Sequence, residues 1–334
     1  MGEQDERPSR TPSGRVSMAM VANRAGVSGQ TVSRVVNSSP RVDPATRARV
    51  EKAMTELGYR PHRAARALRT GRTQTIGLVV TTLATVGNSR MLQATAEAAE
   101  ARGYALLLVT ASESVAAAFE RLRDQGVDGA IVLNEASALT RAEDRPEGLR
   151  LVVVDAPPTP GVRVVHSDHA GGAAAATRTL LAAGHENVWH LAGPADSFAA
   201  TERERGWRET LLAAGIAPAP VVRGDWSAAS GHVAARALLE ATAVFSANDQ
   251  MALGLIRALD EHGRRVPEDV SVIGFDDVPD AANYRPPLTT VRQDFAALAD
   301  RAVAALVAEI EGIEAVSGEA TVVPTLLTER DSTP

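Results

Sequence analysis

Residues 20–37 read MVANRAGVSGQTVSRVVN, and this stretch decides the fold of the first part of the chain. It predicts two short helices joined by a tight turn. Gly26 stands where the chain must turn sharply, and glycine adopts the positive φ that such a turn requires. Ser28 is suited to cap the second helix, while Val27 and Val32 would face a small core.

The outward face of the second helix carries side chains that suit a DNA major groove. Glutamine pairs with adenine, arginine pairs with guanine, and hydroxyl groups bind phosphate. An ordinary helical hairpin with a polar face is the alternative on these residues alone. The candidate DNA-contacting residues of this helix are Ser28, Gly29, Gln30, Thr31, Ser33 and Arg34.

Charge is distributed unevenly along the 334 residues. Residues 1–72 hold 14 Lys and Arg against 6 Asp and Glu, whereas residues 73–334 hold 21 against 35. A basic head on an acidic body is typical of a DNA reader attached to a separate sensor. Arginine richness from genome composition is the alternative, but it does not explain why the excess lies at one end.

Composition excludes several classes of protein. Hydrophobic residues make up 45% and charged residues 23%, as in globular proteins. The chain has no cysteine, which excludes disulfides, thiolate metal sites and cysteine nucleophiles and fits a reducing cytoplasm. No apolar run is long enough to span a membrane, and the N-terminus lacks the apolar core of a signal peptide. We therefore expect a cytoplasmic protein.

A third helix should begin at Pro44, with Asp43 as its cap, and end at Gly58. This helix would close the small core. Residues 1–15 are polar and predict a disordered tail. Residues 61–72 favour helix by composition but have little to bury, so we expect them to fold only against DNA and a second copy. A plain linker helix is the alternative for this segment.

From Thr75 onward, short apolar runs alternate with alanine-rich helical stretches. This pattern predicts parallel sheets built from strand–helix–strand units. About 260 residues exceed one compact sheet, so we expect two lobes with a cleft between them. The predicted strands are 76–80, 104–109, 130–133, 151–154, 188–191, 244–245 and 270–275.

Short motifs recur along nearly the whole chain, and together they indicate a family. They include Val21-Ala22, Ala25-Gly26-Val27-Ser28, Thr31-Val32-Ser33-Arg34-Val35-Val36-Asn37, Leu191-Ala192-Gly193-Pro194, Gly224-Asp225-Trp226-Ser227-Ala228, Asn248-Asp249-Gln250-Met251 and Gly274-Phe275-Asp276-Asp277. With these motifs the chain resembles the LacI–GalR family of transcriptional regulators. The run around Trp226 and Asn248 is narrower and resembles the members that respond to a galactoside.

The resemblance implies an N-terminal all-α helix-turn-helix DNA-binding domain at 16–60 and a hinge helix at 61–72. It further implies an α/β core at 73–330 with two lobes like those of periplasmic binding proteins, built on parallel sheets. The first lobe would comprise about 73–168 and 293–320, and the second about 169–292 and 321–330.

The resemblance also assigns contacts to the head. Gly29, Gln30 and Arg34 match positions that specify the operator sequence, and Asn37 and Thr46 match phosphate-contacting positions. Ala65 and Leu68 match hinge residues that enter the minor groove, where an apolar wedge kinks the duplex. His62 stands where most relatives have asparagine, so this position departs from the family pattern.

Four residues of the predicted second lobe suit a sugar: Arg203, Trp226, Asn248 and Asp276. An indole offers a flat face for the C–H side of a pyranose, and the polar groups can pair with hydroxyls. By resemblance these four hold a galactoside, and Thr81 lies at the pocket edge. Taken singly, each has a plainer alternative as a surface or turn residue.

The sequence therefore predicts a repressor of sugar-utilisation genes, released from a pseudo-palindromic double-stranded operator by a galactoside-like effector. We expect a homodimer, because the last residues lack the leucine repeat of the family's tetramers, and we expect no cofactor, metal site or catalytic residue. A different sugar or a purine is the alternative effector. A solute-binding protein and a sugar hydrolase using Asp249, Asp276 and Asp277 are the rival classes, although nothing in the sequence marks an acid of raised pKa.

Overall fold

The computed structural model describes residues 16–36, 39–59, 71–111, 114–133, 148–158, 160–313 and 320–334. The predicted tail, Asn37, Ala65 and Leu68 lie outside these residues. The chain divides into two compact units, Met1–Thr73 and Gln74–Pro334. None of the described helices combines the length and the apolar composition that crossing a bilayer demands.

The first unit contains the three predicted helices: α1 (Met18–Ala25), α2 (Gly29–Val36) and α3 (Pro44–Leu57). Gly26 ends α1 in the left-handed region, with φ of 66°. Asp43 caps α3 by accepting a hydrogen bond from the Thr46 amide at 2.9 Å. Val21, Val32 and Val50, one from each helix, are fully buried and form the centre of the small core.

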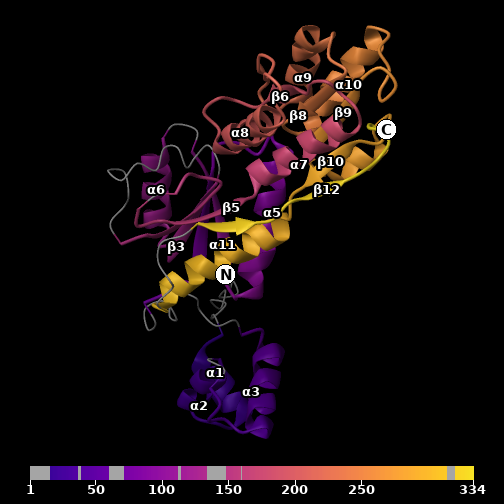
Figure 1. Ribbon diagram of the computed structural model, residues 1–334. Helices are drawn as coiled ribbons and strands as arrows, with labels where there is room; N and C mark the ends of the chain where they lie inside the picture. The colour runs from indigo at the N-terminus through magenta and orange to yellow at the C-terminus, as the bar shows by residue number, and fades with distance from the viewer. Residues whose placement is uncertain are drawn as a thin grey trace, which may run out of the picture. The chain divides into compact units, whose positions relative to one another are not determined.

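The second unit has two six-stranded sheets, each carrying helices on both faces (Figure 1). The first lobe comprises β1 (Thr75–Val80), α5 (Val86–Ala101), β2 (Ala105–Thr110), α6 (Val115–Asp124), β3 (Gly129–Leu133), β4 (Arg150–Val154), β5 (Arg163–Ser167), α11 (Phe295–Glu311) and β11 (Thr321–Val323). Its strands lie in the order β11-β5-β4-β3-β1-β2 and are all parallel.

The second lobe repeats this design with different helices. It comprises α7 (His169–Ala182), β6 (Trp189–Ala192), α8 (Phe198–Ala213), β7 (Val222–Arg223), α9 (Ala228–Ala234), η3 (Ala235–Leu238), β8 (Ala243–Ser246), α10 (Asp249–Glu261), β9 (Ser271–Asp276), η4 (Pro279–Asn283), β10 (Thr289–Arg292) and β12 (Leu326–Thr328). The strand order is β12-β10-β9-β8-β6-β7. The pairing of β10 with β12 is antiparallel, so the prediction of parallel sheets fails at this edge.

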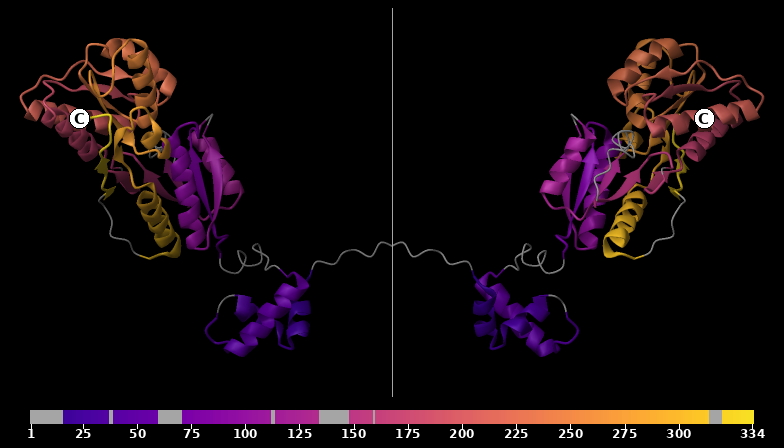
Figure 2. Two further views of the ribbon diagram at one scale, coloured as in Figure 1. Left: turned by 90° about the vertical axis from the view of Figure 1, so that its right-hand side faces the viewer. Right: turned by 90° about the vertical axis from the view of Figure 1, so that its left-hand side faces the viewer.

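The chain crosses between the lobes three times, after β5, after β10 and after β11. In both views of Figure 2 the late helix α11 lies with the elements of the first lobe, where it packs against α5 and the central strands. The last crossing falls between Val323 and Leu326. Residues 321–323 therefore belong to the first lobe, and their assignment to the second lobe is wrong: β11 finds its hydrogen-bond partner in β5.

Each sheet is buried on both faces, as parallel sheets require. In the second lobe, α7 and α8 cover one face and α9 and α10 cover the other. Close approach between paired helices depends on glycine: a Cβ on Gly206 of α8 would lie 2.1 Å from the Ala170 carbonyl oxygen of α7. All seven predicted strands are present, while β5, β7, β10, β11 and β12 are additional.

One histidine in this core, His190, is difficult to protonate because it is buried. His190 of β6 is fully buried, stacks on the Phe245 ring at 4.8 Å, and donates from Nδ1 to the Phe245 carbonyl oxygen at 2.9 Å. Among the described residues its Nε2 has no hydrogen-bond partner. Burial lowers the pKa of His190 to about 4, because a buried imidazolium would lose its hydration.

We expect this histidine to make core stability depend on pH. The unfolded ring binds its proton near pH 6.5 and the folded ring near pH 4, so the unfolded state holds more protons between these values. The free energy of unfolding should therefore fall by up to about 3 kcal/mol as pH drops through this window. Chemical denaturation followed by circular dichroism at pH 7, 5.5 and 4.5 measures it.

His190→Phe should remove most of that pH dependence while leaving the aromatic stack. Trp207→Phe, at the neighbouring ring 5.2 Å away, is the control: it should lower stability at every pH and keep the slope. An unaltered slope in His190→Phe would show that other groups cause it.

Candidate functional site

The helix α2 has a buried face and an outward face. Val32 and Val35 are buried, whereas Gly29, Gln30 and Arg34 are exposed. The Ser28 hydroxyl caps the helix by accepting a hydrogen bond from the Thr31 amide at 3.1 Å. Thr31 and Ser33 are half-buried. The helix thus presents polar side chains from its first two turns.

The start of α3 adds a hydroxyl to the head. Thr46 is half-buried, and its Oγ1 accepts a hydrogen bond from Nη2 of Arg49 at 3.3 Å. Arg24 of α1 forms an ion pair of 2.5 Å with Glu56 of α3. This ion pair joins the first helix to the third.

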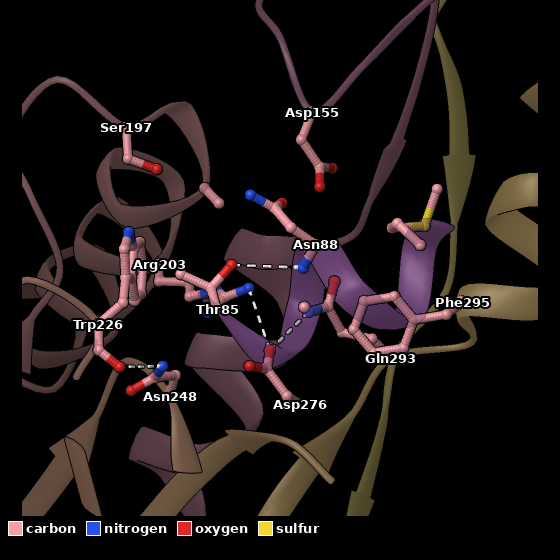
Figure 3. A pocket seen from close by; sticks show the side chains of 13 residues that line it. Thr85, Asn88, Asp155, Ser197, Arg203, Trp226, Asn248, Asp276, Gln293 and Phe295 are labelled. Carbon is pink, nitrogen blue, oxygen red and sulfur yellow. Dashed lines mark hydrogen bonds and ion pairs between the residues drawn. The ribbon is translucent and has the colours of Figure 1, made fainter. Parts of the chain in front are cut away.

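A pocket lies in the second unit, at the carboxyl ends of strands from both lobes (Figure 3). It encloses about 490 Å³ of space between atoms, with the open solvent at its mouth included. In open α/β sheets, ligands bind at this end of the strands. The lining residues are Thr85, Gly87, Asn88, Met91, Asp155, Ser197, Ala199, Arg203, Trp226, Asn248, Asp276, Gln293 and Phe295.

Four of the five predicted ligand residues line this pocket: Arg203, Trp226, Asn248 and Asp276. Thr81 does not. It directly follows β1 and is half-buried, and it is Thr85 and Gly87, four and six residues further on, that reach the lining. Thr81 lies outside the lining, and its place at the pocket edge stays a prediction.

Arg203 of α8 is the most connected side chain of the pocket. It is only 4% exposed. Its Nη1 donates to the carbonyl oxygen of Ala247, Nη2 lies 3.5 Å from Oδ1 of Asp276, and Nε and Nη2 lie 3.4 and 3.3 Å from Nδ1 of His169. Its guanidinium stacks 3.8 Å above the Phe275 ring centroid. The guanidinium is therefore fixed before any ligand arrives.

A second buried contact runs from Arg203 into the first lobe. Because a guanidinium can only donate, Nδ1 of His169 accepts, and its Nε2 then donates to Oδ1 of Asp155 at 2.9 Å. Burial alone would raise the pKa of Asp155, but the hydrogen bonds that its carboxylate accepts from His169 and from the Ser167 amide, together with the nearby charge of Arg203, outweigh burial and lower the pKa. Asp155 is thus an anion at neutral pH.

Asp276, the last residue of β9, faces Arg203 and the crossing after β10. Its Oδ1 accepts a hydrogen bond from Nε2 of Gln293 at 2.6 Å, and dashed lines in Figure 3 join it to both partners. Burial raises the pKa of Asp276, and Arg203 and Gln293 oppose that rise. Within the part of the chain that the structure describes, the buried Oε1 of Gln293 has no hydrogen-bond partner.

Trp226 and Asn248 hold one another in place. Trp226 has a φ of 76°, and its ring lies so near Gly193 that a Cβ there would be 2.4 Å away. Asn248 donates from Nδ2 to the Trp226 carbonyl oxygen at 3.0 Å and caps α10 by accepting from the Met251 amide at 2.9 Å. Asn248 therefore has a structural role in addition to its place in the lining.

Sequence reasoning missed several lining residues that a simple rule would find. Asp155 and Gln293 directly follow the ends of β4 and β10, where side chains point into the crevice. Ser197 is the cap of α8. The strand 151–154 was predicted, so the polar residue after it was a usable signal, whereas β10 was not predicted.

The three carboxylates considered for hydrolysis are not equivalent. Asp249 is fully buried outside the lining, with Oδ1 bonded to Thr290 and Oδ2 to the Val278 amide. Burial and nearby Asp276 raise the pKa of Asp249 well above its usual range, a shift that nothing in the sequence marks. Asp277 forms an ion pair of 2.6 Å with Arg330. No group of three potential metal ligands is found within the described ranges.

Comparison with known proteins agrees with both units. The family model "Bacterial regulatory proteins, lacI family" matches residues 17–62, and the model "Periplasmic binding protein-like domain" matches residues 177–333. The HTH-type transcriptional regulator CelR of Thermobifida fusca is 40% identical over 302 residues, 84% of this chain and 87% of CelR. The lactose operon repressor of Escherichia coli (strain K12) is 37% identical over 331 residues, 95% and 91% of the two chains.

Solved structures agree as well. The lac repressor dimer bound to operator and the anti-inducer ONPF has a TM-score of 0.83 at 35% identity, covering 96% of this chain and 99% of that chain. The CelR–cellobiose complex has a TM-score of 0.70 at 36% identity, covering 95% and 100%. The chain therefore belongs to the LacI family of bacterial transcriptional regulators, which joins a helix-turn-helix DNA-binding domain to a two-lobed α/β core.

Proposed function

We propose that the chain is a repressor that binds a pseudo-palindromic operator as a homodimer and is released by a galactoside-like sugar in the pocket of its core. The observation that carries the sugar part is the fixed pair of Arg203 and Asp276 beside Trp226 in one buried pocket. A guanidinium and a carboxylate side by side offer donors and an acceptor to neighbouring hydroxyls.

In the head, we assign base recognition to Gln30 and Arg34, the two long exposed side chains of α2. Ser28, Thr31, Ser33 and Thr46 carry short hydroxyls suited to phosphate, which fixes register but carries no sequence information. Gly29 brings no side chain to its base pair. The roles proposed for Asn37, Ala65 and Leu68, a phosphate contact and the minor-groove wedge, rest on the family resemblance.

Carbohydrate suits the pocket better than a purine. Its buried polar groups favour ligands with several hydroxyls, because a ligand without them leaves these groups unpaired. Gln293 Oε1 and Asp155 add acceptors to the same lining. The lactose operon repressor and CelR are similar to this chain to comparable degrees, so we keep a galactoside as the proposal and cellobiose as the first competitor to be tested.

The pairing of two chains is supported by two uncovered apolar surfaces. Strand β2 is the edge of the first sheet, and on it Leu106 and Leu107 are half-buried and Leu108 is 37% exposed. In the second lobe, Val233 of α9 is 71% exposed and Leu253 of α10 is 40% exposed. An apolar edge strand is an association site unless it is covered. A second copy would cover both surfaces.

The first prediction of this proposal concerns the effector. Operators selected from random duplexes by the purified chain should be released by a galactoside, and Trp226→Ala should weaken that response at least about tenfold, equal to about 1.4 kcal/mol of binding. Operator affinity without sugar should change less than about threefold. Fluorescence anisotropy of labelled operator against galactosides, glucosides, cellobiose and purines measures both. Trp226→Phe keeps an aromatic face and should respond at an intermediate level.

If cellobiose alone releases the operator, the effector is cellobiose and not a galactoside, while the proposal of a sugar-responsive repressor stands. Hydrolysis of a chromogenic galactoside would instead support the hydrolase class.

The second prediction concerns DNA recognition. Arg34→Ala should relax base preference at one position of each half-site, by about 1–3 kcal/mol at that base pair. Thr31→Ala, which removes a hydroxyl assigned to phosphate, should weaken all operators about equally. Repeating the selection with each variant tests the assignment, and a uniform loss in Arg34→Ala would assign Arg34 to phosphate.

The third prediction concerns assembly. Leu253→Lys places a charge on the α9–α10 surface and should shift sedimentation velocity from dimer towards monomer. Leu212→Lys is the matched control, since Leu212 on α8 is 57% exposed and lies on neither surface. If both variants sediment like the original chain, the α9–α10 surface is not the interface.

A further inference from the structure

One helix of the first lobe touches the second lobe through its first two turns. The Val86 amide, the first of α5, donates to Oε1 of Gln250 on α10 at 3.2 Å. The Val86 side chain packs against the hydrophobic core of the second lobe, next to α10. The start of α5 is therefore docked on the second lobe by a polar and an apolar contact.

Arg90 lies one turn further along α5 and makes the next contact across the lobes. Residues four apart lie on the same side of a helix, so Arg90 continues the stripe that Val86 begins. Its Nη1 donates to the carbonyl oxygen of Asp276 at 3.3 Å and to that of Asp277 at 3.1 Å. The guanidinium lies 4.7 Å from the ring centroid of Phe295, a residue of the pocket lining.

The turn that Arg90 reaches has an unusual backbone. Asp276 has a φ of 112° and Asp277 a φ of 49°, in a region that residues other than glycine rarely adopt. Such conformations persist only where surrounding contacts impose them. Arg90 binds both carbonyl oxygens of this strained pair, and Arg330 holds the Asp277 carboxylate at 2.6 Å.

The rest of the first two turns of α5 forms a wall of the pocket. Gly87, Asn88 and Met91 all belong to the lining. The Nδ2 of Asn88 donates to the Thr82 carbonyl oxygen at 3.0 Å, within the first lobe. Because the wall and the docked stripe belong to one rigid helix, undocking the stripe would move the wall away from Asp276.

We propose that Arg90 is a positioning residue for the pocket: it docks α5 on the Asp276–Asp277 turn and so keeps the lobes in the arrangement where the wall formed by α5 faces Asp276. The docking itself is independent of any ligand. Its consequence for effector binding rests on the proposed function.

The docking is tested without a ligand by hydrogen exchange of the Val86 amide in the full chain. Arg90→Gln should speed exchange at this amide at least about tenfold, because the helix start would leave Gln250 more often. Amides of β3 and β4, in the centre of the first sheet, report global stability and should exchange as in the original chain. Arg90→Lys keeps the positive charge but has a single donor nitrogen, so its Val86 exchange rate should lie between those of the original chain and Arg90→Gln.

Arg102→Gln is the matched control at the C-terminal cap of the same helix. Arg102 donates to the Ala98 carbonyl oxygen at 3.1 Å and pairs with Asp300 at 2.8 Å, both within the first lobe. Its loss should leave Val86 exchange within about twofold. Unchanged Val86 exchange in Arg90→Gln, or an equal rise in Arg102→Gln, would overturn the proposal.

A second measurement follows the pocket. For the sugar found to release the operator, Arg90→Gln should weaken binding about tenfold by calorimetry, whereas Arg102→Gln should not. Equal sugar affinity in Arg90→Gln would contradict the positioning role. If no sugar of the panel binds the original chain, the proposed effector fails while the exchange result still decides the docking.

Discussion

The buried guanidinium of Arg203 is the charge around which the pocket is built. A cation removed from water must be surrounded by acceptors, because an unpaired buried charge costs several kcal/mol. Three acceptors meet this demand: the Ala247 carbonyl after β8, the His169 ring at the start of α7 and the Asp276 carboxylate at the end of β9. Elements far apart in the chain converge because one side chain requires all of them.

The same charge connects the two lobes. The His169 tautomer that carries its proton on Nε2 accepts from Arg203 at Nδ1 and donates to Asp155 at Nε2. Because Asp155 belongs to the first lobe, His169 connects Arg203 to that lobe. Gln293 stands at the crossing after β10 and bonds Asp276. In the proposed mechanism, a ligand that binds Arg203 and Asp276 contacts groups already tied to both lobes. Lobe placement and ligand binding are then linked, and sugar and operator weaken each other's binding by the same factor.

Helix α5 supports this linkage from the opposite side. Residues of its first two turns line the pocket, and Val86 and Arg90 dock on the second lobe. Because the same rigid helix lines the pocket and contacts the second lobe, a shift of the lobes changes the shape of the pocket. The strained turn at Asp276 and Asp277 is held by contacts from outside the turn itself.

The sequence by itself determined the local structures and the family. Gly26, Ser28 and Asp43 act within a few residues of themselves, so the three helices of the head could be placed from the sequence. Apolar runs in alternation with helical stretches gave seven strands, because a strand buried on both faces must be continuously apolar. Family motifs pointed to Arg203, Trp226, Asn248 and Asp276, which do line one pocket.

Only the tertiary structure decided the partners. The docking of Arg90 on Asp276 joins positions 186 residues apart, and the Asp155–His169 contact depends on where the chain crosses between the lobes. Strand β11 belongs to the first sheet because it pairs with β5. The three residues of β11 do not specify this partner by themselves. Thr81 and Thr85 look alike in the sequence, and the point where α5 begins decides which of them reaches the pocket. Long-range contacts depend on the whole packing, so no short stretch of residues specifies them.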